Sequence, residues 1–217
     1  MSRAVFEKLT LKSIDVRAVL LPLRRPVVSK VGLFKDWPLV LIDLHTQEGI
    51  VGRSYLEPYL KNAARYIVPA IHDLAAAQLG KLLAPLDNFQ NNRRSLNLVG
   101  YEGVAMIAVS GLDMAVWDAL AKAAGMPLAV LLGGTLGPVP AYNSNGLWLT
   151  DVATLAQEAG ELVAEGGFKG LKLRLTRPSC RRSCRDPGGS QRCRRRHQAH
   201  GRLQPRAIAR SCAEPLP

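Results

Sequence analysis

The sequence predicts a small α+β domain, then a βαβ unit, and finally a tail that does not pack. Three segments with alternating apolar residues precede the helical periodicity, an order typical of α+β domains. Residues 140–175 then run strand, helix, strand, which favours parallel pairing of the two strands. Residues 178–217 hold ten arginines, two acidic residues and no Phe, Tyr, Trp, Val or Met, so we expect this tail to be disordered.

The first domain begins with three predicted strands. Residues 11–21 alternate so that one face is apolar, which indicates a half-buried strand. That face carries Ile14, Val16, Ala18 and Leu20. Residues 39–44 and 50–55 flank the polar segment TQEG, and this arrangement predicts a hairpin.

The clearest helix is predicted for residues 104–124, and Gly125 supplies its stop signal. Small residues recur along it at helical spacing and would allow close packing. They are Ala108, Gly111, Leu112, Ala115 and Ala119. In the βαβ unit, residues 140–144 and 168–175 are the predicted strands. The apolar stripe of the helix between them consists of Val152, Leu155, Ala156, Ala159, Leu162 and Val163.

The last predicted strand, FKGLKLRL, separates its side chains by chemistry. Its leucines point to one side, and Lys172 and Arg174 point to the other, because side chains alternate along a strand. Two interpretations are open. In a (β/α) barrel the two cations face the lumen near the C-terminal end of the strand, where such folds keep their chemistry. In an edge strand they form a solvated basic face.

Four segments carry a resemblance that covers nearly all of residues 10–177. They are PLVLIDLHTQEGIVGRSYLEPY (38–59), GLDMAVWDALAKAAGMPLAVLLGG (111–134), PVPAYNSNG (138–146) and FKGLKLRL (168–175). Together they resemble the enolase superfamily, and within it the mandelate racemase and muconate lactonizing enzyme family. The resemblance implies an α+β capping domain in residues 1–135 and the first strands and helix of an incomplete (β/α) TIM-type barrel in residues 136–177. Residues 178–217 would be an unrelated tail.

The resemblance also implies a chemistry. The family abstracts a proton α to a carboxylate, and Mg²⁺ stabilises the enediolate that results; a Lys or His base with Mg²⁺ is typical of the superfamily. The implied partner is a small α-hydroxy acid or sugar acid. The implied reaction is a racemisation, as in an isomerase, or a dehydration, as in a lyase. Members of the family are often homo-oligomers.

By resemblance, Lys172 and Arg174 occupy the Lys-x-Lys motif, in which the first lysine helps to bind the substrate carboxylate and the second is one of two bases. Arg174 departs from this pattern, because a guanidinium keeps its proton although it can hold a carboxylate by two hydrogen bonds. A one-base reaction such as sugar-acid dehydration is therefore at least as well supported as racemisation. Substrate-binding roles carry over to four residues that also have a plain packing or turn interpretation: Ser144, Val27, Phe34 and Tyr59.

Other polar residues receive no catalytic role from the sequence. His45 and His72 lie far from the barrel segments, and Trp117 and Asp118 are expected to be structural. The family's metal ligands are carboxylates at the ends of the third, fourth and fifth barrel strands, and Mg²⁺ requires such hard oxygen ligands. After residue 174 the only carboxylate side chains are those of one aspartate and one glutamate. We therefore expect no metal ligand, no tightly bound Mg²⁺ and no turnover from this chain alone.

The tail allows rival interpretations. It holds all four cysteines, but their spacing with the two tail histidines matches no common zinc site. Its arginines suggest a second hypothesis, a non-enzymatic protein that binds nucleic acid through phosphates, although no aromatic residue interleaves them. Residues 1–177 have no cysteine, no N-terminal signal pattern and no long apolar run, so we expect a cytoplasmic protein without a membrane anchor.

We hypothesise that the reading frame changes near residues 178–180. Read one nucleotide later, the codons of RRHQAHGRLQP (195–205) allow the peptide DDIKLMVDYN, which contains an apolar strand tipped by an aspartate. This is the form expected of a third barrel strand with its metal ligand. The aspartate would lie 28 to 29 residues beyond Arg174, close to one βα repeat of roughly 30 residues.

Sequencing the gene and its transcript tests this hypothesis. We expect an added or missing nucleotide near codon 178, and further carboxylate-tipped strands downstream in the shifted frame. Residues 178–217 confirmed in the native frame would contradict it.

Overall fold

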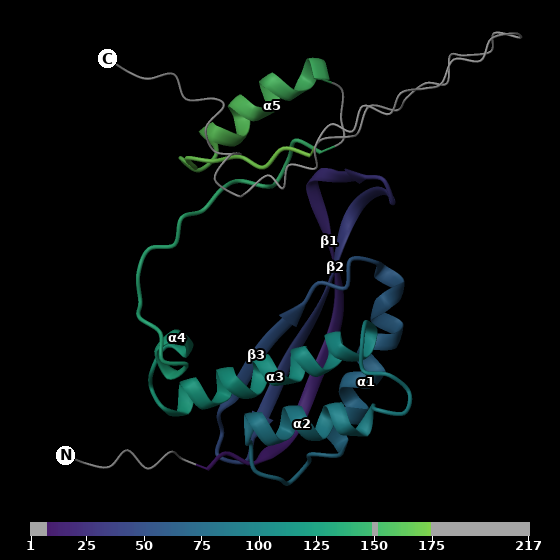
Figure 1. The fold of residues 1–217 in the computed structure, drawn as a ribbon, viewed down its shortest axis with the longest axis vertical. Helices are drawn as coiled ribbons and strands as arrows, with labels where there is room; N and C mark the ends of the chain where they lie inside the picture. The colour runs from purple at the N-terminus through teal and green to yellow at the C-terminus, as the bar shows by residue number, and fades with distance from the viewer. Residues whose placement is uncertain (1–7, 149–151, 175–217) are drawn as a thin grey trace, which may run out of the picture. The chain divides into compact units, whose positions relative to one another are not determined.

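The computed structural model describes residues 8–148 and 152–174 of the chain (Figure 1). Its elements are β1 (Leu11–Ser29), β2 (Gly32–Thr46), β3 (Val51–Leu56), the short 3₁₀ helix η1 (Lys61–Ala63), α1 (Ala64–Ala76), α2 (Pro85–Ser95), α3 (Val104–Ala123), α4 (Leu128–Leu131) and α5 (Val152–Ala164). They form two compact units. Of the described residues, the first unit contains those up to Pro26 and Phe34–Pro138, and the second contains Val27–Leu33 and those from Val139 to Arg174. The predicted tail lies outside the described residues.

The three predicted strands form one sheet in the order β1-β2-β3. β2 and β3 are antiparallel, with Asp43 opposite Arg53. In the turn between them, the Gly49 amide donates to the Thr46 carbonyl at 3.2 Å. Gly49 has a φ of 87°, a left-handed value that glycine adopts without steric cost. The hairpin predicted around TQEG is confirmed.

The first two strands are longer than the sequence pattern predicts. β1 continues to Ser29 and β2 begins at Gly32, both well beyond the predicted segments. Alternation detects a strand only where one face is buried, and the outer part of this hairpin is mostly exposed or half-buried. Pro22 and Pro26 argue against a strand, but β1 lies at an edge of the sheet, where proline is tolerated.

One face of the sheet is buried. The core side chains of β2 are Val40, Ile42 and Leu44, each almost completely buried. The predicted apolar face of β1 is confirmed only in part: Ile14 and Val16 pack against the core, whereas Ala18 is exposed and Leu20 is 53% exposed. The alternation of β1 therefore continues past the last side chain that the core covers, and periodicity overestimates the buried length.

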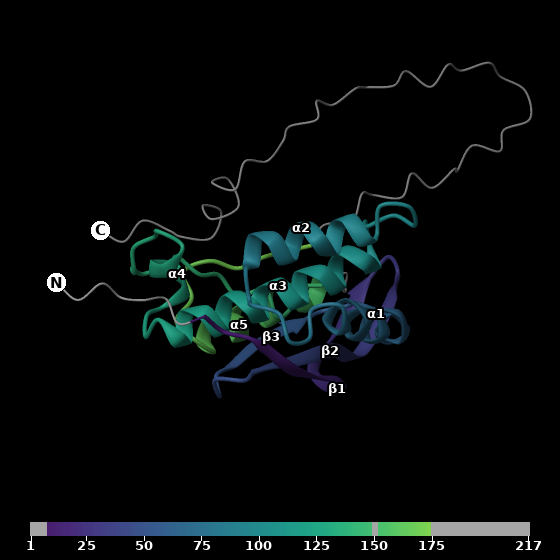
Figure 2. The same ribbon diagram turned by 90° about the horizontal axis from the view of Figure 1, so that it is seen from below.

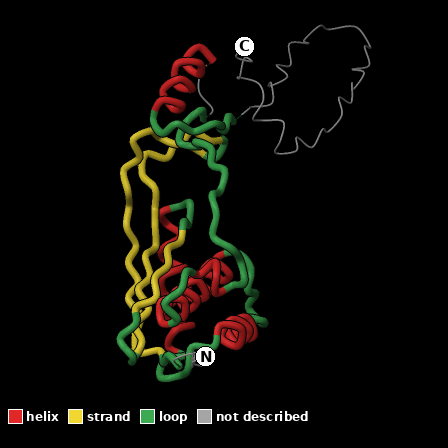
Figure 3. Tube along the Cα trace, turned by 90° about the vertical axis from the view of Figure 1, so that its left-hand side faces the viewer, coloured by secondary structure: helices red, strands yellow, loops and turns green. Residues whose placement is uncertain are grey.

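Helices α1, α2 and α3 lie on the buried side of the sheet (Figures 2 and 3). α3 matches the predicted long helix to within one residue. It ends at Gly125, whose φ is 62°, and the Met126 amide donates back to the Ala121 carbonyl at 3.1 Å, which satisfies a terminal carbonyl of the helix. The five small or apolar residues predicted to allow close packing are all buried: Ala108, Gly111, Leu112, Ala115 and Ala119.

Glycines allow α3 to approach the sheet closely. A Cβ added to Gly111 would lie 2.7 Å from Ile42 Cδ1 and 2.8 Å from Leu56 Cδ1. On the sheet side, a Cβ added to Gly52 would overlap the Ala115 carbonyl oxygen. At Gly52 the strand thus lies directly against the helix backbone, whereas at Gly111 the side chains of Ile42 and Leu56 fill the space that a Cβ would need.

Side chains of α3 also cover the outer edge of β3. Asp118 Oδ2 accepts the Arg53 amide at 2.6 Å, and Lys122 Nζ donates to the Val51 carbonyl at 2.9 Å. The two side chains are themselves paired at 2.6 Å, four residues apart on the helix. Both backbone groups would otherwise be open for pairing with another strand. This α3 clasp, formed by Asp118 and Lys122, agrees with the structural role expected for Asp118.

Helix α3 is rich in apolar residues. By length and mean hydropathy, 1.6 over an 18-residue window, this helix could cross a membrane. The prediction of no long apolar run overlooked it. Eight of its residues are buried within the first unit. Because burial against a sheet and two helices demands apolar side chains, its hydropathy is that of a core helix.

The close contact of α3 and β3 makes Gly52 sensitive to substitution. For Gly52→Ala we expect the free energy of unfolding to fall by about 1–3 kcal/mol, because the new methyl group forces the two backbones apart. Urea denaturation followed by circular dichroism measures this. Gly137→Ala is the matched control, since a Cβ there meets nothing within 4 Å. Equal midpoints for the two variants would contradict the prediction.

Asp113 makes the stability depend on pH. This half-buried residue lies on α3, and burial raises the pKa of its carboxyl above the ordinary 3.8. The folded state then binds the proton more tightly than the unfolded state, so stability falls as the pH rises through the raised pKa. We expect Asp113→Asn to raise Tm at about pH 7 but not at about pH 3, where the carboxyl is protonated in both states.

The exposed Asp36 supplies the control for this experiment. Asp36→Asn should change Tm little at either pH. A lower Tm for Asp113→Asn at neutral pH would show that the carboxylate stabilises the fold, against our expectation.

Candidate functional site

The predicted βαβ unit is present in the second unit with shorter strand pairing than expected. Among the described residues, its two extended segments meet in a single parallel bridge, between Asn143 and Leu171. The Asn143 amide donates to the Gly170 carbonyl at 2.9 Å, and the Lys172 amide donates to the Asn143 carbonyl at 3.0 Å. The parallel direction is confirmed. The predicted continuous strands over residues 140–144 and 168–174 are not confirmed. A barrel strand needs a neighbouring strand on each side, and the described barrel segments give each strand only one neighbour.

Helix α5 connects the two segments, as predicted. Leu162 is completely buried, and Leu155 and Ala159 are half-buried. Ala156 and Val163, which share the predicted apolar stripe, are exposed. The stripe therefore has the right period for a barrel helix, but only its centre is covered by the described residues.

Asn143 organises this unit, and the sequence analysis did not single it out. It is 3% exposed, and its Nδ2 donates to the Leu162 carbonyl at 3.1 Å, in the last turn of α5. Its Oδ1 accepts the Asn145 amide at 3.0 Å. One side chain thus joins the first segment, the helix end and the following turn. An asparagine at the end of an apolar segment is the only signal the sequence offered, and that signal is also typical of an ordinary turn.

The register of the bridge decides which side chains share a face. Asn143 and Leu171 are opposite each other and point toward α5, as the bond from Asn143 to the helix shows. Ser144 and Lys172 follow directly in the two segments, and alternation of side chains predicts that both lie on the other face. Ser144 is half-buried and Lys172 is exposed. The register thus sets these two predicted site residues at neighbouring positions of the paired segments.

Arg174 has a fixed neighbour at the end of the second segment. Its amide donates to the Leu147 carbonyl at 3.1 Å, and its guanidinium lies over the Trp148 ring, 4.6 Å from the centroid. A guanidinium stacked on an indole face is attracted by the ring electrons and held in orientation. Trp148 was not predicted as a site residue, since nothing in the sequence shows that it would meet Arg174.

Two of the three residues predicted from the capping domain, Phe34 and Tyr59, contact the same aromatic side chain. In the first unit, Trp37 packs edge-on against both Phe34, at 6.3 Å, and Tyr59, at 5.7 Å between ring centroids. Tyr59 has a φ of 59°, uncommon for a residue other than glycine, and its side chain is 65% exposed. Val27 is half-buried and belongs to the second unit. Trp37, which joins two of the predicted residues, was missed.

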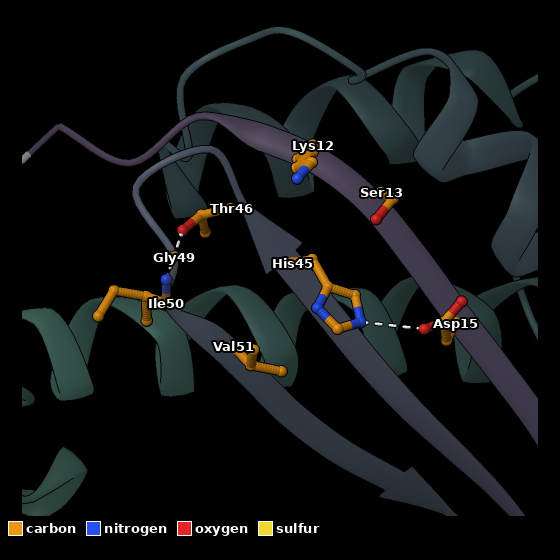
Figure 4. A pocket seen from close by; sticks show the side chains of 8 residues that line it. All are labelled: Lys12, Ser13, Asp15, His45, Thr46, Gly49, Ile50 and Val51. Atoms are coloured by element: carbon orange, nitrogen blue, oxygen red, sulfur yellow. Dashed lines mark hydrogen bonds and ion pairs between the residues drawn. The ribbon is translucent and has the colours of Figure 1, made fainter.

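A polar cavity of about 320 Å³ lies in the first unit along β1, β2 and the start of β3 (Figure 4). Across it, His45 Nε2 pairs with Asp15 Oδ2 at 3.0 Å. Lys12 and Ser13 complete its polar wall. We assign no catalytic role to this pair, in keeping with the expectation for His45, because both side chains are substantially exposed.

The described residues do not fit a magnesium site. Within residues 8–148 and 152–174, no group of three or more His, Cys, Asp or Glu side chains is placed to hold a metal ion. The two tail acids, Asp186 and Glu214, lie outside the described residues.

Comparison with known proteins now identifies the family. Residues 12–133 match the model of the mandelate racemase / muconate lactonizing enzyme family, N-terminal domain. The chain belongs to this family. The resemblance drawn from the four segments is thereby confirmed, as is an α+β capping domain at the N-terminus.

Solved structures of the enolase superfamily share the fold. An enolase from alpha proteobacterium bal199 with bound Mg is 56% identical, with a TM-score of 0.75 over 78% of this chain and 48% of that chain. An enolase from Bradyrhizobium, complexed with magnesium and mandelic acid, is 36% identical, with a TM-score of 0.70 over 78% of this chain and 46% of its own. Magnesium is thus the metal of these family members.

Curated relatives of this mandelate racemase-type chain are sugar-acid dehydratases. L-talarate/galactarate dehydratase of Salmonella typhimurium is 30% identical over 168 residues, which cover 74% of this chain and 42% of the relative. D-galactonate dehydratase of Xanthomonas campestris is 33% identical over 95 residues, 44% of this chain and 24% of the relative. The chain thus spans less than half the length of these relatives.

Proposed function

We propose that this chain carries the carboxylate-binding part of an enzyme that abstracts a proton α to the carboxylate of a sugar acid or α-hydroxy acid. One observation supports the proposal most: the parallel bridge sets Ser144 and Lys172 at neighbouring positions, where alternation predicts that both side chains point away from α5. Arg174, two residues beyond Lys172, adds a second cation on the same segment.

The two cations and the hydroxyl have complementary tasks. A substrate carboxylate is attracted by the Lys172 ammonium, a compact charge with three donors, and by the fork of the Arg174 guanidinium. Ser144 contributes a hydroxyl donor to the same oxygen atoms. Withdrawing electron density from the carboxylate makes the neighbouring Cα–H bond more acidic, which is the first requirement of enolisation. Trp148 supports this task by fixing the plane of Arg174.

Arg174 also bears on the type of reaction. Racemisation needs a base on each side of Cα, and a guanidinium does not release its proton to serve as one. Dehydration needs one base and an acid for the leaving hydroxyl. The sugar-acid dehydratases among the relatives support this alternative. The mandelic acid bound by the Bradyrhizobium enolase supports the racemase-type substrate. We favour dehydration of a sugar acid.

The solved relatives hold magnesium, an ion that can stabilise negative charge on oxygen. The described residues of this chain lack a ligand cluster for the metal, so no step is assigned to it here. Nor does the described part of the βαβ unit place an ordinary base beside Lys172. We therefore propose that the chain alone binds an acid substrate weakly and does not turn it over.

Titration of the chain with galactarate, followed by amide chemical shifts, tests the proposal. We expect shifts at residues 144, 172 and 174, with a dissociation constant in the millimolar range. Lys172→Met and Arg174→Met should each weaken binding by about tenfold, the effect of removing one charge-assisted hydrogen bond. Lys169→Met is the matched control, because Lys169 is an exposed lysine on the same segment.

The uncharged galactitol should cause no shift at these residues. In D₂O with Mg²⁺, the Cα hydrogen of galactarate should stay unexchanged. Shifts that survive in both variants, or that are lost equally in the control, would contradict a carboxylate site. Exchange of the Cα hydrogen would contradict the expected lack of turnover.

A further inference from the structure

A cleft of about 620 Å³ opens between α1 and α2 in the first unit, and no residue assigned to the proposed site lines it. α1 contributes Asp73 and Leu74 to its wall, α2 contributes Asn88 and Asn92, and the start of α3 contributes Ala105. Pockets of 300–1,000 Å³ with mostly apolar walls and a few placed polar groups are typical of small-molecule sites. The polar groups of this cleft therefore indicate what it could bind.

Three amide side chains form a chain of hydrogen bonds along the wall. Gln78 Nε2 donates to Asn92 Oδ1 at 2.7 Å and to the Leu74 carbonyl at 3.3 Å. Asn88 Nδ2 donates to Gln78 Oε1, and the Ala84 amide donates to Asn88 Oδ1 at 3.0 Å. Gln78 is 9% exposed and Asn92 is 6% exposed. Such a network is stable only if its buried members are paired.

Backbone groups at both ends fix the direction of this network. The Leu74 carbonyl can only accept, so the Gln78 atom facing it is the nitrogen, and the Asn92 atom that meets the same nitrogen must be the oxygen. The Ala84 amide can only donate, which independently makes the facing Asn88 atom an oxygen. Both ends require the same orientation, so the remaining side-chain atom of Asn92 is its NH₂ group.

That NH₂ group has no hydrogen-bond partner among the residues that the structure describes. Asn92 lines the cleft and is more than nine-tenths buried. Among the described residues this nitrogen is not one of the fully buried side-chain atoms that lack a partner, so solvent reaches it, and water or a ligand in the cleft can pair with it. Asn92 therefore offers two N–H donors to whatever occupies the inner part of the cleft.

The rim of the cleft has the opposite hydrogen-bonding character. Asp73 and Asp87 are exposed and line it with carboxylates, which only accept. Lys81 lies between the helices and already donates to the Ala77 carbonyl at 2.7 Å. The cleft thus pairs donors at its inner wall with acceptors at its rim, and its charged side chains sum to one negative charge.

We propose that this cleft binds a small, uncharged, polyhydroxylated molecule of the size of a hexitol. A hydroxyl both accepts and donates, so neighbouring hydroxyls on one carbon chain can accept from Asn92 and donate to Asp73 and Asp87. A carboxylate would meet the two aspartates as a like charge, and an ammonium cannot accept from Asn92. The apolar side chains of Leu74, Leu96 and Ala105 cover the carbon atoms. The inference does not depend on the proposed function.

Titrating the full chain with D-glucitol at millimolar concentrations tests this inference. The side-chain NH₂ signals of Asn92 should shift, together with the backbone amides of residues 73 and 87. Asp73→Asn and Asp87→Asn should each raise the dissociation constant by about tenfold, because each removes a charge-assisted acceptor. Asp36→Asn, at an exposed aspartate outside the cleft, should leave binding unchanged.

Two further comparisons make the result decisive. Asn92→Asp keeps the oxygen that Gln78 needs but removes the donor, so glucitol binding should be lost while Tm shows whether the fold persists. Hexane-1,6-diol, which lacks neighbouring hydroxyls, should bind more weakly than glucitol. If Asn92→Asp does not fold, Asp73→Asn and Asp87→Asn still test whether the cleft binds glucitol. Unshifted Asn92 signals at 100 mM glucitol, or equal shifts throughout the chain, would overturn the proposal.

Discussion

The contact between α3 and β3 is the constraint on which the first unit depends. Gly52 and Gly111 leave no room for a methyl group, and at Gly52 the strand lies directly against the backbone of the helix. This contact places Val109 and Leu112 in the core beside β2 and brings Asp118 within reach of the strand edge. The two partners belong to the segments 38–59 and 111–134, which also carried the resemblance to the family. The residues that allow this close packing therefore lie in the same segments that resemble the family.

The second unit rests on a single side chain in a similar way. Asn143 holds the end of α5 and the turn after the first segment, and its backbone pairs with the second segment. This arrangement sets the register, and the register places Ser144 beside Lys172. A buried asparagine thus connects local hydrogen bonding to the arrangement of the candidate substrate-binding groups. Asn143, whose side chain points toward α5, thus sets which residues are expected on the opposite face.

What could be predicted from sequence was local. The TQEG hairpin and α3 each follow from signals within a few residues, a polar turn or a helical repeat that ends at Gly125. The sides expected for Lys172 and Arg174 rest on strand alternation and stay a prediction, because residues 172–174 form no continuous strand. Trp148 under Arg174, Trp37 between Phe34 and Tyr59, and the amides of α1 and α2 depend on segments that meet only after folding. No pattern in one segment specifies the partner from another.

The α3 clasp has a consequence for the protein while it is being made. The bonds from Asp118 to Arg53 and from Lys122 to Val51 join positions 65 and 71 residues apart. Ribosomes add about 5–20 residues per second, so β3 emerges roughly 4–14 seconds before the side chains that will cover its rim. During this interval the half-finished sheet can pair with a neighbouring chain. Once residue 122 has been added and α3 has docked on the sheet, the edge of β3 is covered and can no longer pair with another chain.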